Sequence, residues 1–285
     1  MTQPHPYFDG PAFVILGHRG TAGTRPENTL ASFIQSLKDG ADTLESDLHL
    51  TKDGEIIMMH DPVVDRTTNG TGPISEMTLK EIKALDAGYK FTPDGGKTYP
   101  FRSQGIKVPT LAEALSAFPD KRINLEIKDN NQELVEKVVD LIAATGREDS
   151  VLLTAGDDET MKKLRAYVEK TGSQVAISAS TGEIFDFFMG VGQDTPPPKG
   201  VMALQVPYKI EFGGENITVV TPAFVEKAHK HGIHVHVWTI DDPKEMKELR
   251  DMGVDGIFTD FPKLAKQVLS NAPKTKPQTP KGPKL

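Results

Sequence analysis

Residues 16–29, LGHRGTAGTRPENT, place two side chains with distinct chemistry directly after an apolar run. The imidazole of His18 can gain or lose a proton near neutral pH, and the guanidinium of Arg19 beside it carries a fixed positive charge. A connection between a strand and a helix needs turn-forming residues, which the three glycines supply, but it does not need this pair. What the pair can do depends on which other side chains reach the same place.

Three carboxylates are expected to point into one space from neighbouring strands. Glu45 and Asp47 lie two residues apart in one strand-like run, and Glu126 lies in the next barrel strand; alternate side chains of a strand share a face. Buried unpaired carboxylates are very costly, and a hard divalent cation with oxygen ligands relieves that cost. The set predicts one divalent metal ion, Mg²⁺ or Ca²⁺ rather than zinc.

Further groups complete a phosphate site in this prediction. Lys128 shares a strand face with Glu126 and adds a point charge to the bidentate guanidinium of Arg19. His60 follows the run IIMMH and, together with His18, can transfer protons near neutral pH. The alternative is a barrel interior in which the carboxylates pair with Lys128 without a metal. It is disfavoured because buried ion pairs seldom offset their desolvation.

These side chains need a fold that gathers strand ends, and the chain has the pattern of one. Strands are expected at 13–17, 43–48, 56–60, 123–128, 151–154, 174–180, 201–206, 234–240 and 255–260, and helices at 29–39, 111–118, 132–144, 159–170, 222–231, 243–252 and 262–270. Alternation of this kind is typical of a parallel α/β sheet with right-handed crossovers. Nine strands are one too many for a barrel, and Asp53-Gly54 predicts a hairpin that makes 56–60 antiparallel. Eight strands remain, which predicts a (β/α)8 TIM barrel.

The hairpin also predicts where His60 lies. If residues 50 and 55 pair, His60 is opposite Glu45. Residues 61–108 have no strong periodicity and are expected to form a small inserted subdomain after strand 2, with one short helix at 79–84. Long loops of this kind are usually functional.

The composition limits the classes of protein to which the chain can belong. The chain has 285 residues, a net charge of −7 and no cysteine, which argues against a general nucleic-acid or membrane-surface binder and excludes disulfides and thiolate sites. No window suits a membrane span and no signal peptide is recognised, so a cytoplasmic protein is expected, with export left open for a chain whose signal has been removed. The barrel domain is expected at 11–270, including the hairpin and insertion at 51–108, and a disordered Pro/Lys-rich tail at 271–285.

Several segments together carry a family resemblance. In order, "GHRG", "PENT", "GADTLESDLHLTKDGEIIMMHD", "NLEIK", "VHVWT" and "GIFTD" closely resemble the glycerophosphodiester phosphodiesterase family, over nearly all of residues 12–268. The resemblance implies a TIM barrel, a subdomain inserted after strand 2, and metal-dependent hydrolysis of glycerophosphodiesters to sn-glycerol 3-phosphate and an alcohol. A small-molecule substrate is implied, with neither nucleic acid nor stable membrane insertion.

The resemblance also implies roles for individual residues. It matches His18 and His60 to a general acid/base pair, Glu45, Asp47 and Glu126 to metal ligands, Arg19 and Lys128 to phosphate contacts, and Trp238 to an aromatic residue lining the substrate pocket. His60 is favoured as the acid that protonates the departing alcohol. From its position near the end of a strand, Gln205 is a further candidate for contact with the polar head group.

Alternatives stay open beside this interpretation. The run IFDFFMG at 184–190 suggests an apolar lip at Phe187 and Phe188 for an acyl chain, and so a lysophospholipase D-like activity, although a helix face packed on the barrel explains the run slightly better. A non-catalytic barrel that binds a phosphate ligand is the alternative from another class. His236 is expected to be a core histidine, and Glu27 and Asn28 to set the entry turn and cap the first helix.

Overall fold

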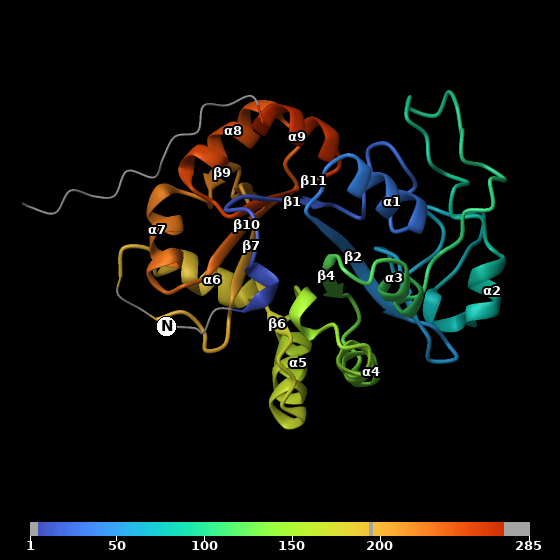
Figure 1. Ribbon diagram of the computed structural model, residues 1–285, viewed down its shortest axis with the longest axis horizontal. Helices are drawn as coiled ribbons and strands as arrows, with labels where there is room; N and C mark the ends of the chain where they lie inside the picture. The colour runs from blue at the N-terminus through green and yellow to red at the C-terminus, as the bar shows by residue number, and fades with distance from the viewer. Residues whose placement is uncertain (1–4, 194–195, 271–285) are drawn as a thin grey trace, which may run out of the picture.

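Eight parallel strands form the centre of the protein. The computed structural model describes residues 5–193 and 196–270, and Figure 1 shows the strands encircled by helices. The strands follow the order β6-β5-β4-β2-β1-β11-β10-β7 along the sheet. Their bounds are β1 Val14–Gly17, β2 Thr43–Leu50, β4 Arg122–Ile127, β5 Val151–Thr154, β6 Ala176–Ile177, β7 Ala203–Pro207, β10 His234–Trp238 and β11 Gly256–Thr259.

The two ends of this sheet, β6 and β7, meet through a short contact. Ser178, just after β6, forms an isolated parallel bridge with Ala203. The Ala179 amide donates to the Ala203 carbonyl at 3.0 Å, and the Met202 amide donates to the Ile177 carbonyl at 3.0 Å. The sheet is therefore a nearly closed barrel, which confirms the predicted (β/α)8 fold.

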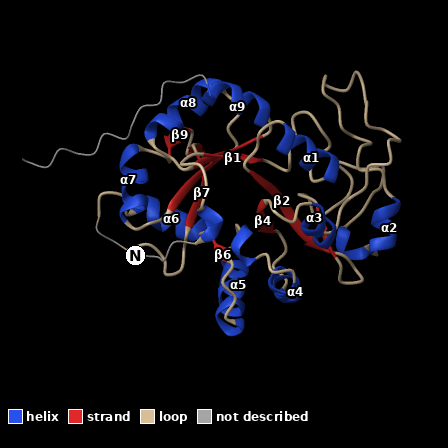
Figure 2. Cartoon of the chain, in the orientation of Figure 1, coloured by secondary structure: helices blue, strands red, loops and turns tan. Residues whose placement is uncertain are grey.

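Helices cover the outside of the barrel (Figure 2). Their bounds are α1 Leu30–Lys38, α3 Leu111–Ala117, α4 Gln132–Ala144, α5 Asp158–Thr171, α6 Thr181–Met189, α7 Pro222–Lys230, α8 Pro243–Met252 and α9 Pro262–Ser270, with a 3₁₀ turn η3 at Glu148–Ser150. Polar N-caps start α1 and α3 to α8, and Thr110 and Ser180 complete capping boxes with the glutamates three residues on. Leu44, Leu125 and Leu153 pack outward beneath the helices. The helices predicted from the sequence end within one residue of these bounds.

The hairpin after β2 has a different register from the one expected. β3 (Ile56–Met58) pairs antiparallel with β2, and Leu50 lies opposite Ile56 instead of residue 55. The Thr51 amide donates to the Glu55 carbonyl, which leaves three residues in the loop. One of them, Gly54, has a left-handed φ of 79°. The predicted pairing is wrong by one residue, and so is the placement of His60 directly opposite Glu45.

The insertion expected after the hairpin lies at the right of Figure 1. It contains a 3₁₀ turn, η2 Ile74–Glu76, and the predicted short helix, α2 Leu79–Ala84. A hydrophobic cluster of its own includes Val64 and Ile82 and joins Ile57 of the hairpin. These buried contacts anchor the insertion to the carboxyl end of β2.

A second hairpin, between β7 and α7, is absent from the sequence prediction. Its strands are β8 Lys209–Phe212 and β9 Glu215–Thr218, joined by a turn in which Gly213 and Gly214 both have positive φ. Its side chains are almost all exposed. The run Lys209–Phe212 does alternate polar and apolar residues, but it is only four residues long, and its apolar side chains Ile210 and Phe212 stay 38% and 72% exposed.

The segment before β1 closes the amino end of the barrel. The turn η1 (Pro6–Phe8) inserts Tyr7, 3% exposed, against Leu152 and Ala203. Arg122, at the start of β4, donates through Nη1 to the carbonyl of Asp9 at 2.7 Å. The predicted disordered tail, 271–285, lies outside the described residues.

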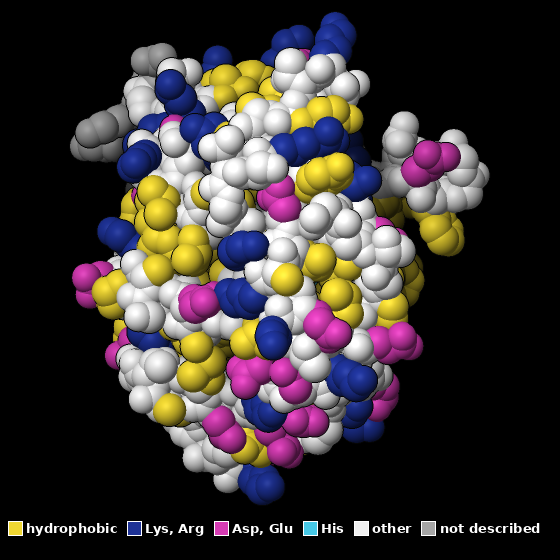
Figure 3. All heavy atoms as spheres, turned by 90° about the vertical axis from the view of Figure 1, so that its right-hand side faces the viewer, with side chains coloured by type: hydrophobic (Ala, Val, Ile, Leu, Met, Phe, Trp, Pro, Cys, Tyr) yellow, Lys and Arg dark blue, Asp and Glu magenta, His cyan; other side chains and the backbone are white. Residues whose placement is uncertain are grey.

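The surface carries charge of both signs. Figure 3 shows the face at the right of Figure 1, where lysine and arginine are interspersed with aspartate and glutamate among the described residues. Among residues 5–193 and 196–270, no helix has the length and apolar character to cross a bilayer.

Candidate active site

A pocket of about 390 Å³ opens at the carboxyl ends of the barrel strands. The structure brings every site residue predicted from the sequence to its lining: His18, Arg19, Glu45, Asp47, His60, Glu126, Lys128, Gln205 and Trp238. These residues come from β1, β2, the end of the β3 hairpin, β4, β7 and β10. Strand ends of a parallel barrel meet on one face, which explains how positions 220 residues apart share one pocket.

The turn after β1 sets His18 and Arg19. Arg19 has a φ of 50°, a left-handed conformation that is uncommon outside glycine, and its amide donates to Glu45 Oε2 at 2.7 Å. A Cβ on Gly17 would lie 2.4 Å from the Gly20 carbonyl oxygen, so the tight turn requires glycine there. Backbone strain at this point is held by the hydrogen bond to Glu45, as is common at functional sites.

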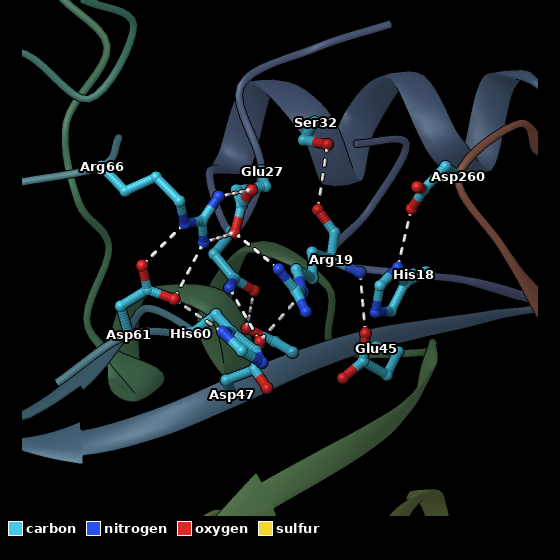
Figure 4. A network of polar contacts seen from close by, with 12 residues as sticks. His18, Arg19, Glu27, Ser32, Glu45, Asp47, His60, Asp61, Arg66 and Asp260 are labelled. Atoms are coloured by element: carbon cyan, nitrogen blue, oxygen red, sulfur yellow. Dashed lines mark hydrogen bonds and ion pairs between the residues drawn. The ribbon is translucent and has the colours of Figure 1, made fainter. Parts of the chain in front are cut away.

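Each of the two histidines is paired with an aspartate through Nδ1. His18 Nδ1 lies 2.7 Å from Asp260 Oδ1, and His60 Nδ1 lies 2.7 Å from Asp61 Oδ1 (Figure 4). A carboxylate on Nδ1 fixes the proton there and leaves Nε2 as the nitrogen that can exchange protons. Burial lowers the pKa of His18, but the Asp260 hydrogen bond and the Glu45 charge outweigh it, so the net pKa is raised.

The three carboxylates differ in their surroundings. Asp47, 2% exposed, accepts from Asn28 Nδ2 at 2.9 Å, and its Oδ1 lies 3.3 Å from Lys128 Nζ. Glu126 is Asp47's partner in the β2–β4 register and accepts from the same Lys128 Nζ at 3.0 Å. Glu45 is 4% exposed, and burial together with the Asp47 charge raises its pKa to about 7.

The donor chemistry fits a hard divalent cation. All three side chains offer oxygen ligands. The raised pKa of Glu45 shows that its ionised form is disfavoured by burial and by Asp47, and a nearby cation would stabilise that form. In the part of the chain that the structure describes, however, no three His, Asp or Glu side chains converge on one metal position. The Lys128 ammonium lies within ion-pair distance of Asp47 and Glu126, as in the metal-free alternative for the barrel interior.

The predicted substrate contacts lie at two depths. Trp238 is 45% exposed at the mouth of the pocket. Gln205 is 8% exposed, and its Nε2 donates to Asn124 Oδ1 at 2.6 Å across the barrel interior. Gln205 therefore forms part of the pocket floor, with its amide nitrogen already bonded.

Glu27 and Asn28 lie in the entry turn before α1, as the sequence suggests, but neither of them caps the helix. The N-cap of α1 is Thr29, whose hydroxyl accepts from the Ser32 amide. Asn28, with a φ of 53°, accepts from Ser46 Oγ at 2.6 Å and donates to Asp47. Glu27 accepts from Arg19 Nη1 at 3.0 Å. Both residues thus support groups that line the pocket.

Two supporting residues have no role assigned from the sequence. Asp260 follows β11, which pairs directly with β1, so the strand order would have placed it beside His18. Arg66 lies in the aperiodic insertion and bonds both Glu27 and Asp61. No periodic signal in the sequence marks Arg66.

The prediction that Phe187 forms part of an apolar lip is wrong. This side chain is 3% exposed and packs edge-on against Phe224 at a ring distance of 5.1 Å, and Phe188 packs on the same core. The exposed members of α6 are Phe185 and Met189, at 61% and 59%. The helix-face alternative is confirmed for Phe187.

His236 lies away from this pocket, as expected for a core histidine. It is 2% exposed, lines a separate pocket at the amino end of the barrel and has no hydrogen-bond partner for Nδ1 among the described residues. Burial lowers its pKa to about 4.

The His236→Gln variant should therefore lose less stability than the wild type on acidification. In the unfolded chain His236 binds a proton below about pH 6.5, whereas in the folded protein it stays neutral. The free energy of unfolding of the wild type therefore falls by about 2 kcal/mol from this group as the pH drops from 7 to 5. Urea unfolding at both pH values measures the difference. Equal losses of stability in the wild type and the variant would contradict a His236 that is buried and neutral in the folded protein.

Comparison with known proteins places the chain among relatives of one kind. A model described as the glycerophosphoryl diester phosphodiesterase family matches residues 18–264. A glycerophosphodiester phosphodiesterase of Caldanaerobacter subterraneus subsp. tengcongensis is 31% identical over 254 residues, covering 87% of this chain and 94% of that protein. A lysophospholipase D of Mus musculus is 27% identical, covering 90% and 86%. The solved structure of an Oleispira antarctica phosphodiesterase in complex with the product sn-glycerol-3-phosphate has a TM-score of 0.71 at 24% identity, covering 90% and 97%.

Proposed function

The chain belongs to the glycerophosphoryl diester phosphodiesterase family, and on that premise we propose that it hydrolyses glycerophosphodiesters to sn-glycerol 3-phosphate and an alcohol. The observation that carries the proposal is the set of groups in one pocket: two histidines, each with an aspartate on Nδ1, facing Arg19 and Lys128. A phosphodiester needs both functions, because its charge must be neutralised and protons must move on two oxygens.

Arg19 and Lys128 are proposed to bind the non-bridging oxygens of the phosphodiester. Arg19 Nε is buried and forms no hydrogen bond with any described residue, but it lies 3.5 Å from Asp47 Oδ2 as an ion pair; its Nη1 donates to Glu27. Lys128 is held at the pocket wall by Asp47 and Glu126. Fixed cations at this position stabilise charge that develops on the phosphoryl oxygens.

His18 is proposed as the base and His60 as the acid. The raised pKa of His18 makes its Nε2 a stronger proton acceptor for the nucleophile, either water or the neighbouring glycerol 2-hydroxyl. His60, oriented by Asp61, then protonates the departing alcohol. Both proton transfers use Nε2, because Nδ1 of each ring is bonded to its aspartate.

Glu45, Asp47 and Glu126 are proposed to hold one divalent ion, Mg²⁺ or Ca²⁺. Such an ion supplies Lewis-acid polarisation of a phosphoryl oxygen. The buried oxygen donors and the raised pKa of Glu45 support this assignment. Lys128, which contacts Asp47 and Glu126, would then be released to contact the substrate phosphate.

A second candidate is lysophospholipase D-like hydrolysis of lysophospholipids. It is favoured by the exposed Phe185 and Met189 on α6, whose Ile184 lines the pocket. The murine relative carries that activity in its name.

A panel assay tests the proposal. Glycerophosphocholine, glycerophosphoethanolamine and lysophosphatidylcholine are incubated with Mg²⁺, with Ca²⁺ and with chelator, and released glycerol 3-phosphate and choline are measured. We expect turnover of the first two with at least one metal. Preference for lysophosphatidylcholine would favour the second candidate. If no phosphodiester is turned over with either metal, the non-catalytic binding barrel becomes the better description.

A further inference from the structure

Arg66 bridges two carboxylates at the edge of the pocket (Figure 4). Its Nε and Nη2 donate to the two oxygens of Asp61 at 2.6 and 3.1 Å. Its Nη1 and Nη2 donate to the two oxygens of Glu27 at 2.6 and 2.7 Å. One guanidinium thus makes two bidentate pairs, which are among the strongest and most directional polar contacts in proteins.

Each of these carboxylates also holds a residue that lines the pocket. Asp61 Oδ1 accepts from His60 Nδ1, and Glu27 Oε1 accepts from Arg19 Nη1. Arg66 is not among the described residues that line the pocket. It therefore contacts the site through two partners, one on the histidine side and one on the arginine side.

The backbone around Arg66 is rigidly anchored. Val64 and Thr68 are fully buried, the Thr68 hydroxyl donates to the Val64 carbonyl at 2.7 Å, and the Val64 amide donates to Gly72. The insertion's own hydrophobic cluster includes Val64. The guanidinium thus extends from a fixed backbone, and its planar fork loses less freedom per hydrogen bond than a flexible ammonium would.

We propose that Arg66 is a positioning residue that couples the proton-transfer side of the pocket to its phosphate-binding side, an inference that rests on the function proposed above for His60 and Arg19. Its charge keeps Asp61 ionised: the Arg66 hydrogen bond holds the pKa of that carboxyl well below its usual range. An ionised Asp61 accepts the Nδ1 proton of His60 and presents Nε2 to the substrate. Glu27, fixed by the same guanidinium, sets the direction of Arg19.

The Arg66→Ala variant is expected to change both kinetic constants. kcat should fall about 10–100-fold, since His60 loses its fixed orientation, and KM should rise several-fold, since Arg19 loses its fixed direction; both are typical of lost outer-shell contacts. Arg66→Lys should recover only part of each loss, because an ammonium cannot form both bidentate pairs. Full recovery by lysine would overturn the argument from geometry.

Double-mutant cycles separate positioning from a general structural role. If Arg66 acts on kcat through Asp61, Arg66→Ala should have little further effect on kcat in the Asp61→Asn background. If it acts on KM through Glu27, the KM effect should vanish in the Glu27→Gln background. Additive effects in both backgrounds would overturn the proposal.

The matched control is Arg102→Ala in the same insertion. Arg102 donates to the Tyr89 carbonyl at 2.7 Å and stacks on Tyr99, and none of these three residues lines the pocket. Its removal should leave kcat and KM within about twofold, as for most surface substitutions. A wild type without phosphodiesterase activity would contradict the proposed function. An active wild type together with a fully active Arg66→Ala variant would contradict only the positioning role of Arg66.

Discussion

The His60→Ala variant is expected to lose about 10²–10⁴-fold in kcat on glycerophosphocholine, the range that a positioned acid or base contributes. The alcohol that leaves from this substrate is a poor leaving group and needs a proton as the bond to phosphorus breaks. His60 is the group proposed to deliver it, from a ring whose Nδ1 is fixed by Asp61 at 2.7 Å. Steady-state kinetics on the purified variant measures the loss.

The discriminating measurement uses a second substrate with an activated aryl leaving group. A p-nitrophenolate ion leaves without a proton, so His60→Ala should retain most of its activity on a p-nitrophenyl phosphodiester. His18→Ala should lose activity on both substrates, because its partner Asp260 and its raised pKa suit the base that activates the nucleophile. Equal losses by His60→Ala on both substrates would contradict its role as the acid.

A histidine outside the pocket controls for general effects of the substitution. His231 lies at the end of α7, and its backbone amide bonds to Ala228. His231→Ala should keep wild-type kinetics on both substrates. Circular dichroism of all three variants then shows whether a loss reflects chemistry or unfolding.

Period-two patterns predicted where the carboxylates proposed as metal ligands lie. Glu45 and Asp47 share the inward face of β2, and Glu126 is registered beside Asp47 on β4. The alternation of strands and helices predicted the barrel, and the barrel in turn placed the strand ends together. Pocket residues that lie on a regular strand can therefore be predicted from the sequence.

Supporting residues on irregular backbone are not visible in the same way. Arg66 lies in the insertion, where no periodicity assigns a face, and its four hydrogen bonds depend on the fold of Val64 to Thr68. The register of β3 depended on whether the turn held two or three residues, which the left-handed Gly54 settled. Phe187 and Phe185 differ by two positions on one helix, and only packing against Phe224 separates buried from exposed.

Removal of divalent cations is expected to lower activity on glycerophosphocholine by about 10³-fold or more, because a bound cation contributes several kcal/mol to stabilising phosphoryl charge. We expect Glu45 to depend most on the ion, since it is buried and its pKa is raised to about 7 by burial and by Asp47. Activity measured after chelation and dialysis, with Mg²⁺ and Ca²⁺ added back separately, gives the size of the effect and the preferred ion.

Binding of the metal itself provides a readout independent of turnover. Titration calorimetry with Mg²⁺ and with Ca²⁺ should give one site per chain, and Glu45→Gln should weaken that site at least about tenfold because one anionic ligand is removed. Glu159→Gln is the matched control, since Glu159 is 66% exposed on α5 and pairs only loosely with Lys162 at 3.9 Å. Full activity in chelator would leave Lys128, already 3.0 Å from Glu126 and 3.3 Å from Asp47, as the cation that balances these carboxylates. The barrel would then be a phosphodiesterase site built on ion pairs alone.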